Sequence, residues 1–321
     1  MSSIREVELN RRATVSEILN AKFLSLDDEF SSLILGRRTQ SEYIEKFLDL
    51  WEEGKLIVLG KFAEEDILGI ATLGLESNKV GVIHVQSPDV ETDISYNYTI
   101  EKELFDKGFE ILRKCEPWVT TGGSGWLSKT VVEHALQLGF KKYDMISMKA
   151  DREKLETIKV PETPSEYGLK LYDVKLNDEV ARLFYDSFQD SPDRVAEPDT
   201  LSSGERSKSF VSKVVNNQYG DFNEGAYSWI LTHNDKIVGV NMRSTYGNIG
   251  FGIGMCLKPS YRGKGLGRLL FTHSIFHMLH TAPQIEEMHL ETSSINPARN
   301  LYSSVGFTIT STHSRITWNK D

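Results

Sequence analysis

The sequence has few cysteines, no long apolar run and no excess of positive charge, and each absence excludes a class of protein. Cys115 and Cys256 are the only cysteines and form no CxxC pair, so neither a disulfide framework nor a cysteine zinc site is expected. The charged residues at the start do not resemble a signal peptide, and no stretch approaches the ~18 apolar residues of a membrane-spanning helix. The 37 basic and 46 acidic residues give a net charge of −9, which argues against electrostatic binding of nucleic acid. We therefore expect a cytoplasmic protein with neither a membrane nor a nucleic-acid partner.

The length of 321 residues leaves room for two domains. Two prolines in the segment 160–165 interrupt the periodic pattern, and we place the domain boundary there, giving domains 1–160 and 161–321. The second half predicts the order β-α-α-β-β-β-α-β-α-β, with a helix capped by Asp178, a second helix near 205–217 and a hairpin turn at Asn234-Asp235. The first half repeats this order more weakly. The sequence therefore predicts a mixed α/β fold that arose by internal duplication.

One window of the second half is rich in cations and free of acids. No acid lies between Asp235 and Glu286, and the cations inside the window are Lys236, Arg243, Lys258, Arg262, Lys264 and Arg268. The segment RGKGLG at 262–267 falls where a predicted strand ends and a helix begins, so glycine N–H groups and the helix dipole favour a pyrophosphate. Its spacing fits neither a Walker A loop, which needs Ser or Thr after GK, nor a dinucleotide fingerprint.

The predicted strand before this turn is rich in glycine. Gly250, Gly252 and Gly254 recur with period two, so the alternation of side chains predicts one bare face and one apolar face. Three glycines in register indicate either a ligand lying along the strand or a crowded contact with a neighbouring helix.

These residues carry a resemblance to a known family. The run LKPSYRGKGLG at 257–267 resembles the acetyl-CoA signature of the GNAT superfamily of N-acetyltransferases, with Arg262, Gly265 and Gly267 at its fixed positions. The run NPARNLYSSVGF at 296–307 resembles the second motif of that family, an Asn followed by a Tyr on a short helix and then Gly-Phe. In element order the resemblance covers 167–321.

The resemblance implies direct transfer of an acetyl group from acetyl-CoA to a primary amine in a ternary complex, without a metal. A backbone N–H near Cys256 and Leu257 would polarise the thioester carbonyl, and Tyr302 would protonate the departing thiolate. The residues implied to bind the cofactor are Met255, Cys256, Leu257, Arg262, Gly263, Lys264, Gly265, Leu266, Gly267, Arg268, Asn296, Arg299 and Tyr302.

Other candidate residues have two interpretations. Glu291 is a candidate general base, with a water chain as the alternative. His273, His277 and His280 share a helix face, but no Glu or Cys accompanies them, so an ordinary helix face is favoured over a metal site. Cys256 falls in the same alternation as Gly250, Gly252 and Gly254, which would allow an acyl-cysteine intermediate, but a small packing residue is favoured.

The first half departs from the family pattern. Its counterpart of the glycine turn, 87–94, holds three acids and no glycine, and Ala135 or Leu136 stands where Tyr would fall. We therefore expect a degenerate, non-catalytic domain that shapes the acceptor site, as in tandem members of the superfamily. The acceptor would be an amine of a small molecule or peptide, a cationic one being favoured by the negative charge, and the protein would be a monomer or homodimer. The alternatives are a non-catalytic acyl-CoA-binding or regulatory module, and a GNAT-fold transferase with another acyl donor.

Overall fold

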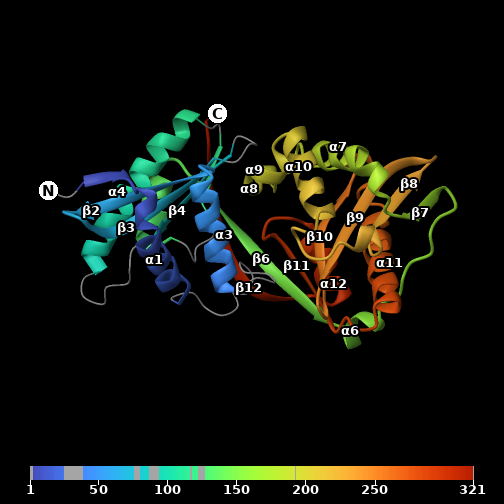
Figure 1. Cartoon of the computed structure of the whole chain (residues 1–321). Coiled ribbons are helices and arrows are strands. Elements are labelled where there is room, and N and C mark those ends of the chain that lie inside the picture. Colours follow the sequence, from blue (N-terminus) through green and yellow to red (C-terminus); the bar gives the residue numbers. More distant parts are fainter. Residues whose placement is uncertain are drawn as a thin grey trace. The chain divides into compact units, whose positions relative to one another are not determined.

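The computed structural model describes residues 3–24, 39–75, 80–86, 94–115, 118–121, 127–191 and 193–320. The chain divides into two compact units, one formed by Met1–Tyr143 with His313–Asp321 and the other by Asp144–Thr312 (Figure 1). The boundary proposed after residue 160 falls inside the second unit, shortly after the short helix α6 (Arg152–Glu156).

The first unit contains one mixed sheet with helices. Its strands follow the order β1-β2-β3-β4-β5-β12, and β4 and β5 run parallel. The main elements are β1 (Ser3–Glu6), α1 (Arg12–Leu24), α3 (Gln40–Glu52), β2 (Leu56–Ala63), β3 (Asp66–Leu75), β4 (Val80–Gln86), α4 (Ile94–Cys115), β5 (Trp118–Thr121), α5 (Lys129–Gln137) and the second part of β12 (Thr308–Asn319).

The second unit also contains one mixed sheet, in the order β12-β6-β11-β10-β9-β8-β7, with β10 and β11 parallel. Its main elements are β6 (Lys141–Asp151), β7 (Tyr167–Leu171), α7 (Asn177–Ser187), α8 (Asp193–Ala196), α9 (Pro198–Leu201), α10 (Gly204–Val215), β8 (Trp229–His233), β9 (Lys236–Tyr246), β10 (Ile249–Leu257), α11 (Leu266–Thr281), β11 (Glu287–Ser293), α12 (Ala298–Val305) and the first part of β12.

The two halves of the chain share one order of elements. From β1 to β6, and again from β7 to β12, the main strands and helices follow the order β-α-α-β-β-β-α-β-α-β. The mixed α/β fold and the repeat predicted from the sequence are therefore both present.

In each unit one strand pairs with a strand from a distant part of the chain. In the first unit, β12 pairs antiparallel with β5, so that Ile316 lies opposite Thr121 and is fully buried. The Trp318 ring packs edge-on against Phe109, with ring centroids 5.1 Å apart. In the second unit, β6 pairs antiparallel with β11, from Met145 opposite Ser293 onward. Residues near 316 and near 148 are therefore paired with strands that lie far from them in sequence.

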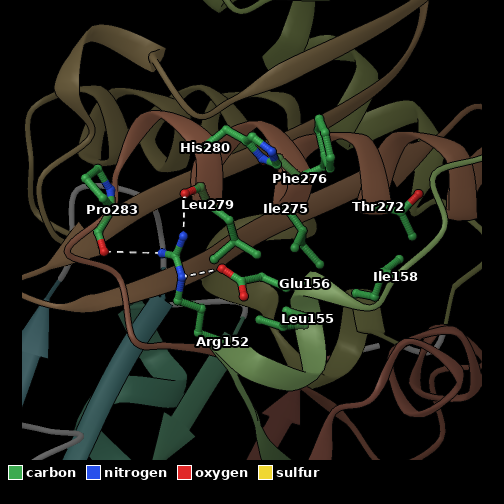
Figure 2. Close-up of a pocket in the computed structure, with 10 residues that line it drawn as sticks. All are labelled: Arg152, Leu155, Glu156, Ile158, Thr272, Ile275, Phe276, Leu279, His280 and Pro283. Atoms are coloured by element: carbon green, nitrogen blue, oxygen red, sulfur yellow. Dashed lines mark hydrogen bonds and ion pairs between the residues drawn. The ribbon is translucent and has the colours of Figure 1, made fainter.

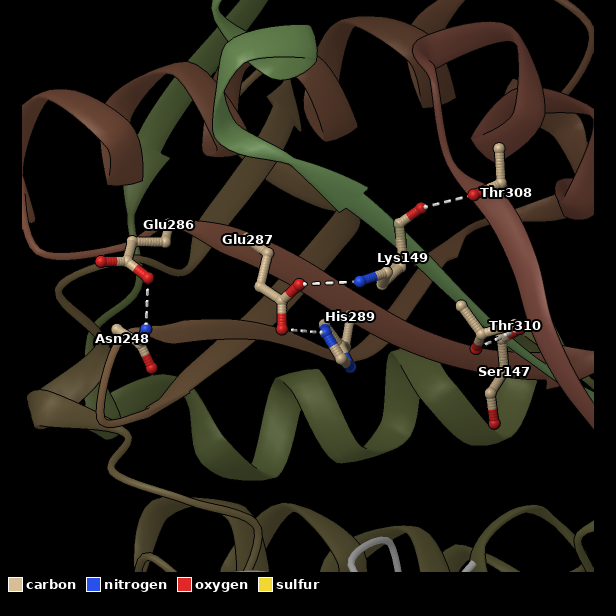
Figure 3. A network of polar contacts seen from close by, with 8 residues as sticks. All are labelled: Ser147, Lys149, Asn248, Glu286, Glu287, His289, Thr308 and Thr310. Atoms are coloured by element: carbon tan, nitrogen blue, oxygen red, sulfur yellow. Dashed lines mark hydrogen bonds and ion pairs between the residues drawn. The ribbon is translucent and has the colours of Figure 1, made fainter. Parts of the chain in front are cut away.

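Polar side chains bridge the paired strands β6 and β11 (Figure 3). His289 lies opposite Lys149 in the register, and Glu287 accepts hydrogen bonds from both: its Oε2 lies 3.1 Å from the Lys149 ammonium and its Oε1 lies 2.8 Å from His289 Nε2. Because these groups are partly exposed, the network stabilises the pairing only modestly.

Arg152, at the start of α6, forms hydrogen bonds with residues at and just beyond the end of α11 (Figure 2). Its guanidinium donates to the backbone oxygens of Leu279 and Ile285, both at 2.9 Å, and to Glu156 at 2.6 Å. The bond to Leu279 O places a cation at the C-terminal end of α11, where the helix dipole favours positive charge.

None of the described helices is both long and apolar enough to cross a membrane.

Two local predictions have different outcomes. The hairpin between β8 and β9 turns at Asn234 and Asp235, whose φ angles of 49° and 60° suit a two-residue turn, so this prediction is confirmed. The predicted capping role of Asp178 is wrong: α7 begins at Asn177, and Asp178 lies in the first turn, where its charge still favours the helix dipole.

The sheet of the second unit separates two apolar clusters. One contains Phe271, Met278 and Tyr302 from α11 and α12, and the other contains Phe184 and Phe210 from α7 and α10. The strand β10 runs between them and contributes side chains to both.

Candidate active site

The parallel strands β10 and β11 part along their length. They pair from Ile249 opposite Glu287 to Gly252 opposite Leu290, although β10 continues to Leu257. The Lys258 N–H donates to Val238 O of β9 at 2.9 Å. Along a strand, the backbone N–H and C=O groups of successive residues point alternately to its two edges. The N–H and C=O of Cys256 therefore face β9, and those of Met255 and Leu257 face the edge from which β11 has separated. Cys256 and Leu257 were the two residues predicted to supply an N–H that polarises the thioester carbonyl. Of the two, Leu257 has its N–H at the edge of β10 that β11 leaves free.

The glycines of β10 do not form one bare face, so this prediction is wrong. A bulge shifts the pairing with β9 between Gly252 and Gly254. A Cβ at Gly250 would meet Met278 of α11, whereas a Cβ at Gly254 would lie 3.0 Å from Phe184 on the other face. The bulge adds one residue to β10 and so reverses the faces of those that follow.

The glycine turn presents free backbone donors. Gly265 has a φ of +77°, which L side chains rarely adopt, and it precedes the first residue of α11. In the part of the chain that the structure describes, the N–H groups of residues 263–268 have no hydrogen-bond acceptor. Together with the dipole of a 16-residue helix, these donors form a cradle suited to phosphate.

The cations around the turn are less available than the sequence indicates. The Arg262 guanidinium donates to the backbone oxygens of Ser187 and Leu257, the latter at 3.2 Å. Arg268 donates to the Ser304 hydroxyl at 2.8 Å, and the Lys264 ammonium lies over the Tyr261 ring. The turn therefore relies on its backbone donors, with Lys264 as an exposed charge.

Arg243 is not at the turn at all. Its side chain is fully buried, Nε donates to the Ser274 hydroxyl at 2.8 Å, and the guanidinium lies over the Phe271 ring at 4.9 Å from the centroid. Burial lowers the pKa of Arg243 to about 10.

A cavity opens where the strands part. It is lined by residues 252–255 of β10 and 290–292 of β11, by aromatic side chains of the flanking helices, and by the polar residues Asp193, Glu197, Asn241, Glu291, Asn296 and Tyr302. The structure thus brings together four of the residues predicted from the sequence: Met255, Glu291, Asn296 and Tyr302. The glycine turn and Arg299, which is exposed, do not line this cavity.

Tyr302 lies on α12 with its side chain buried against Phe271, at a ring-centroid distance of 4.9 Å. Burial raises the pKa of Tyr302 to about 12, Arg243 opposes this, and the negative charges of Asp193 and Glu197 add to it. At neutral pH the phenol is therefore protonated and can donate a proton.

The family model for the acetyltransferase (GNAT) domain matches residues 224–309, which include the glycine turn, the parted strands and Tyr302. The chain carries a GNAT acetyltransferase domain. This confirms the resemblance seen at 257–307, and a domain of this family indicates an acyltransferase. GNAT transferases generally use acetyl-CoA and act on amine acceptors.

Solved structures extend the likeness beyond the GNAT domain. A GCN5-related N-acetyltransferase from Sphaerobacter thermophilus has a TM-score of 0.61 and 14% identity, over 99% of this chain and 95% of that one. A tandem GNAT protein from the clavulanic acid biosynthesis pathway has a TM-score of 0.59 and 14% identity, over 99% and 98%. At such identities the likeness shows the fold, here a tandem one. Comparison with curated proteins gave no significant match.

Asn296 and Asp193 are joined within the GNAT cavity. Asn296 Nδ2 donates to Asp193 Oδ2 at 2.7 Å, while Asn296 Oδ1 accepts at 2.8 Å from the N–H of Ala298, the first residue of α12. Sequence reasoning missed Asp193, because the segment 187–225 carries no motif. The sequence around it shows only an aspartate that follows a serine and a proline, which does not indicate a site.

The structure also bears on the surroundings of Cys256 and of the histidines on α11. Burial raises the pKa of Cys256 to about 12, so its thiol is protonated and packs among apolar side chains, which disfavours an acyl-cysteine. His273 and His277 pack against the Trp229 ring, and no three potential metal ligands cluster among the described residues.

The corresponding places in the first unit are only partly described. Residues 87–93, where a glycine turn would stand, lie outside the described residues. On α5, Ala135 is buried and Leu136 is 39% exposed. Because neither side chain carries a hydroxyl, neither position could donate a proton as Tyr302 could.

Proposed function

We propose that the second unit transfers an acetyl group from acetyl-CoA to a primary amine of a small molecule or peptide, by direct attack in a ternary complex. One observation supports this proposal most strongly: β10 and β11 separate after Gly252 and Leu290, and near this separation lie the free N–H groups of residues 263–268 and the buried Tyr302. The cradle at 263–268 would hold the pyrophosphate, and the free edge of β10 at Met255 and Leu257 would pair with the pantetheine arm.

The chemistry needs three groups around the thioester. The amine nitrogen attacks the carbonyl carbon while the Leu257 N–H stabilises the negative oxygen. The carbon–sulfur bond then breaks, and the Tyr302 hydroxyl gives its proton to the leaving thiolate. Glu291, on β11 at the cavity wall, is the proposed base for the proton that the amine loses, directly or through water. The products are CoA thiol and an amide.

The first unit is proposed not to transfer acetyl groups. Its counterpart of the glycine turn holds three acids in the sequence, which would repel pyrophosphate, and its α5 has no tyrosine at the matching place. The proposal therefore expects one acetyl-CoA site per chain, and a role for the first unit in shaping access of the acceptor.

The test is a transfer assay with the full chain. Acetyl-CoA is incubated with benzylamine, aniline, a diamine, an amino sugar and a lysine peptide, while released CoA thiol and the product mass are followed. We expect thiol release together with an acetylated amine for at least one acceptor. Binding of acetyl-CoA without any consumption would favour the non-catalytic module, and consumption of a longer acyl-CoA alone would identify another donor.

A further inference from the structure

Asp193 is a buried carboxylate that the sequence did not indicate. It lies at the start of α8 with 3% of its surface exposed, and it lines the cavity between the parted strands. Its Oδ2 accepts hydrogen bonds from Asn296 Nδ2 at 2.7 Å and from the Ser191 hydroxyl at 2.9 Å. These two donors fix the orientation of the carboxylate.

The other oxygen of Asp193 is unpaired. Oδ1 is buried and has no hydrogen-bond partner. Ser293 interacts with the carboxylate and favours its ionised form, and its hydroxyl oxygen also accepts from the Ile295 N–H at 3.3 Å, but no donor among the described residues meets Oδ1 with hydrogen-bond geometry. Because an unpaired buried carboxylate oxygen is costly, a fold retains one only where something else satisfies it.

The charge of the cavity indicates what that partner is. Glu197 and Glu291 also line it, and none of its described lining residues is Lys, Arg or His. The nearby cations do not neutralise these acids fully: Arg262 is bound to backbone oxygens although its charge still acts on Asp193, and Arg243 is bound to Ser274 and stacked on Phe271 although its Nη2 has no partner. A group entering beside Asp193 is therefore favoured if it is a hydrogen-bond donor with positive charge.

The position of Asp193 relates this preference to the reaction. Asp193 lines the same cavity as Tyr302, the proposed acid, and its negative charge raises the pKa of that phenol. We infer that Asp193 Oδ1 binds the ammonium of the acceptor and places its nitrogen beside the thioester, which makes Asp193 a specificity-determining residue for cationic amines. This inference rests on the proposed acetyl transfer but concerns the acceptor alone.

Two probes separate charge from shape. Benzylamine is a cation at pH 7 and aniline is neutral, while both carry an amine and a phenyl ring, joined through one methylene in benzylamine and directly in aniline, and the ring suits a cavity lined by phenylalanines. Each is titrated calorimetrically into the full chain loaded with free CoA, using wild type, Asp193→Asn and Asp193→Glu. Asp178→Asn is the matched control, because Asp178 is a highly exposed aspartate of the same unit outside the cavity.

The expected result is selective. Removing the charged partner of a buried ion pair should weaken benzylamine binding by about 30-fold or more in Asp193→Asn, with aniline binding changed less than about threefold. Asp193→Glu should restore part of the preference, and Asp178→Asn should behave as wild type. Because burial raises the pKa of Asp193, its ionisation costs stability, and Asp193→Asn should unfold at the same or a higher temperature at pH 7.

Several outcomes would overturn the inference. They are equal binding of both probes to wild type, absence of benzylamine binding, equal loss of both probes in Asp193→Asn, or a lower unfolding temperature of that variant with loss of the cradle's CoA binding. Failure of the proposed function looks different: benzylamine binding would still depend on Asp193, but no acetyl group would be transferred. Transfer that persists with unchanged benzylamine affinity in Asp193→Asn would reject the inference and keep the function.

Discussion

Gly265 gives the sharpest test of the donor site. Its φ of +77° favours glycine, and a Cβ added there would have nothing within 4 Å. Gly265→Ala should therefore cost about 1–2 kcal/mol of folding stability through the left-handed backbone, without blocking the turn. Gly265→Asp adds a negative charge at the cradle: for unit charges about 4 Å apart the repulsion is about 1 kcal/mol in water and about 4 kcal/mol near a protein surface.

We expect Gly265→Asp to weaken acetyl-CoA and CoA binding by about 30- to 1,000-fold, from about 2–4 kcal/mol, whereas Gly265→Ala changes it by only a few-fold. Calorimetric titration of the full chain measures both affinity and stoichiometry, expected to be one site per chain. Gly247→Asp is the matched control, because Gly247 has a φ of +61° and open space around it but lies in the β9–β10 turn. Wild-type affinity in Gly265→Asp, or an equal loss in Gly247→Asp, would refute the cradle.

Three further predictions follow from the described contacts. Tyr302→Phe should lower kcat by about 100-fold or more while changing the KM for acetyl-CoA little. Because the pKa of Tyr302 is about 12, loss of its proton should not lower the wild-type rate below about pH 10. An unchanged kcat in Tyr302→Phe would show that this residue takes no part in the chemistry. Iodoacetamide at pH 8 should label the exposed Cys115 and spare the buried Cys256, whose pKa is raised to about 12, which mass spectrometry checks; rapid double labelling would contradict this burial. Gly254→Val should cost about 1–3 kcal/mol by crowding Phe184, seen as a lower unfolding temperature of the second unit, and an unaltered transition would show that this contact is loose.

The parts of the fold that the sequence predicted are those with local causes. The hairpin at Asn234-Asp235 depends on two residues that tolerate positive φ, and α12 ends at Gly306, whose φ is 111°. The glycine turn and Tyr302 were found because their residue types and spacing match a family motif. Their placement around one cavity could be expected only through that resemblance, since nothing local brings β10 to α12.

The features that the sequence did not reveal depend on distant contacts. The bulge in β10 is set by its pairing with β9, so the alternation of glycines gave the wrong face for Gly254. Arg243 was counted with the cations of the anion site, yet the packing of α11 places it in the core. Asp193 acquires its meaning from Asn296, 103 positions later in the chain, and pairings of that kind leave no periodic trace.

The shared strand β12 has a consequence for how the protein is made. The first unit is synthesised first, but its sheet includes residues from 313 onward, with Ile316 and Trp318 in contact with its core. A ribosome-bound chain that has emerged as far as residue 300 therefore holds a first unit with β5 unpaired on one edge. Such an edge invites pairing with other chains until translation has passed β12, and slow codons late in the message would prolong that exposure. The unit that is begun first is thus the one whose folding is completed last.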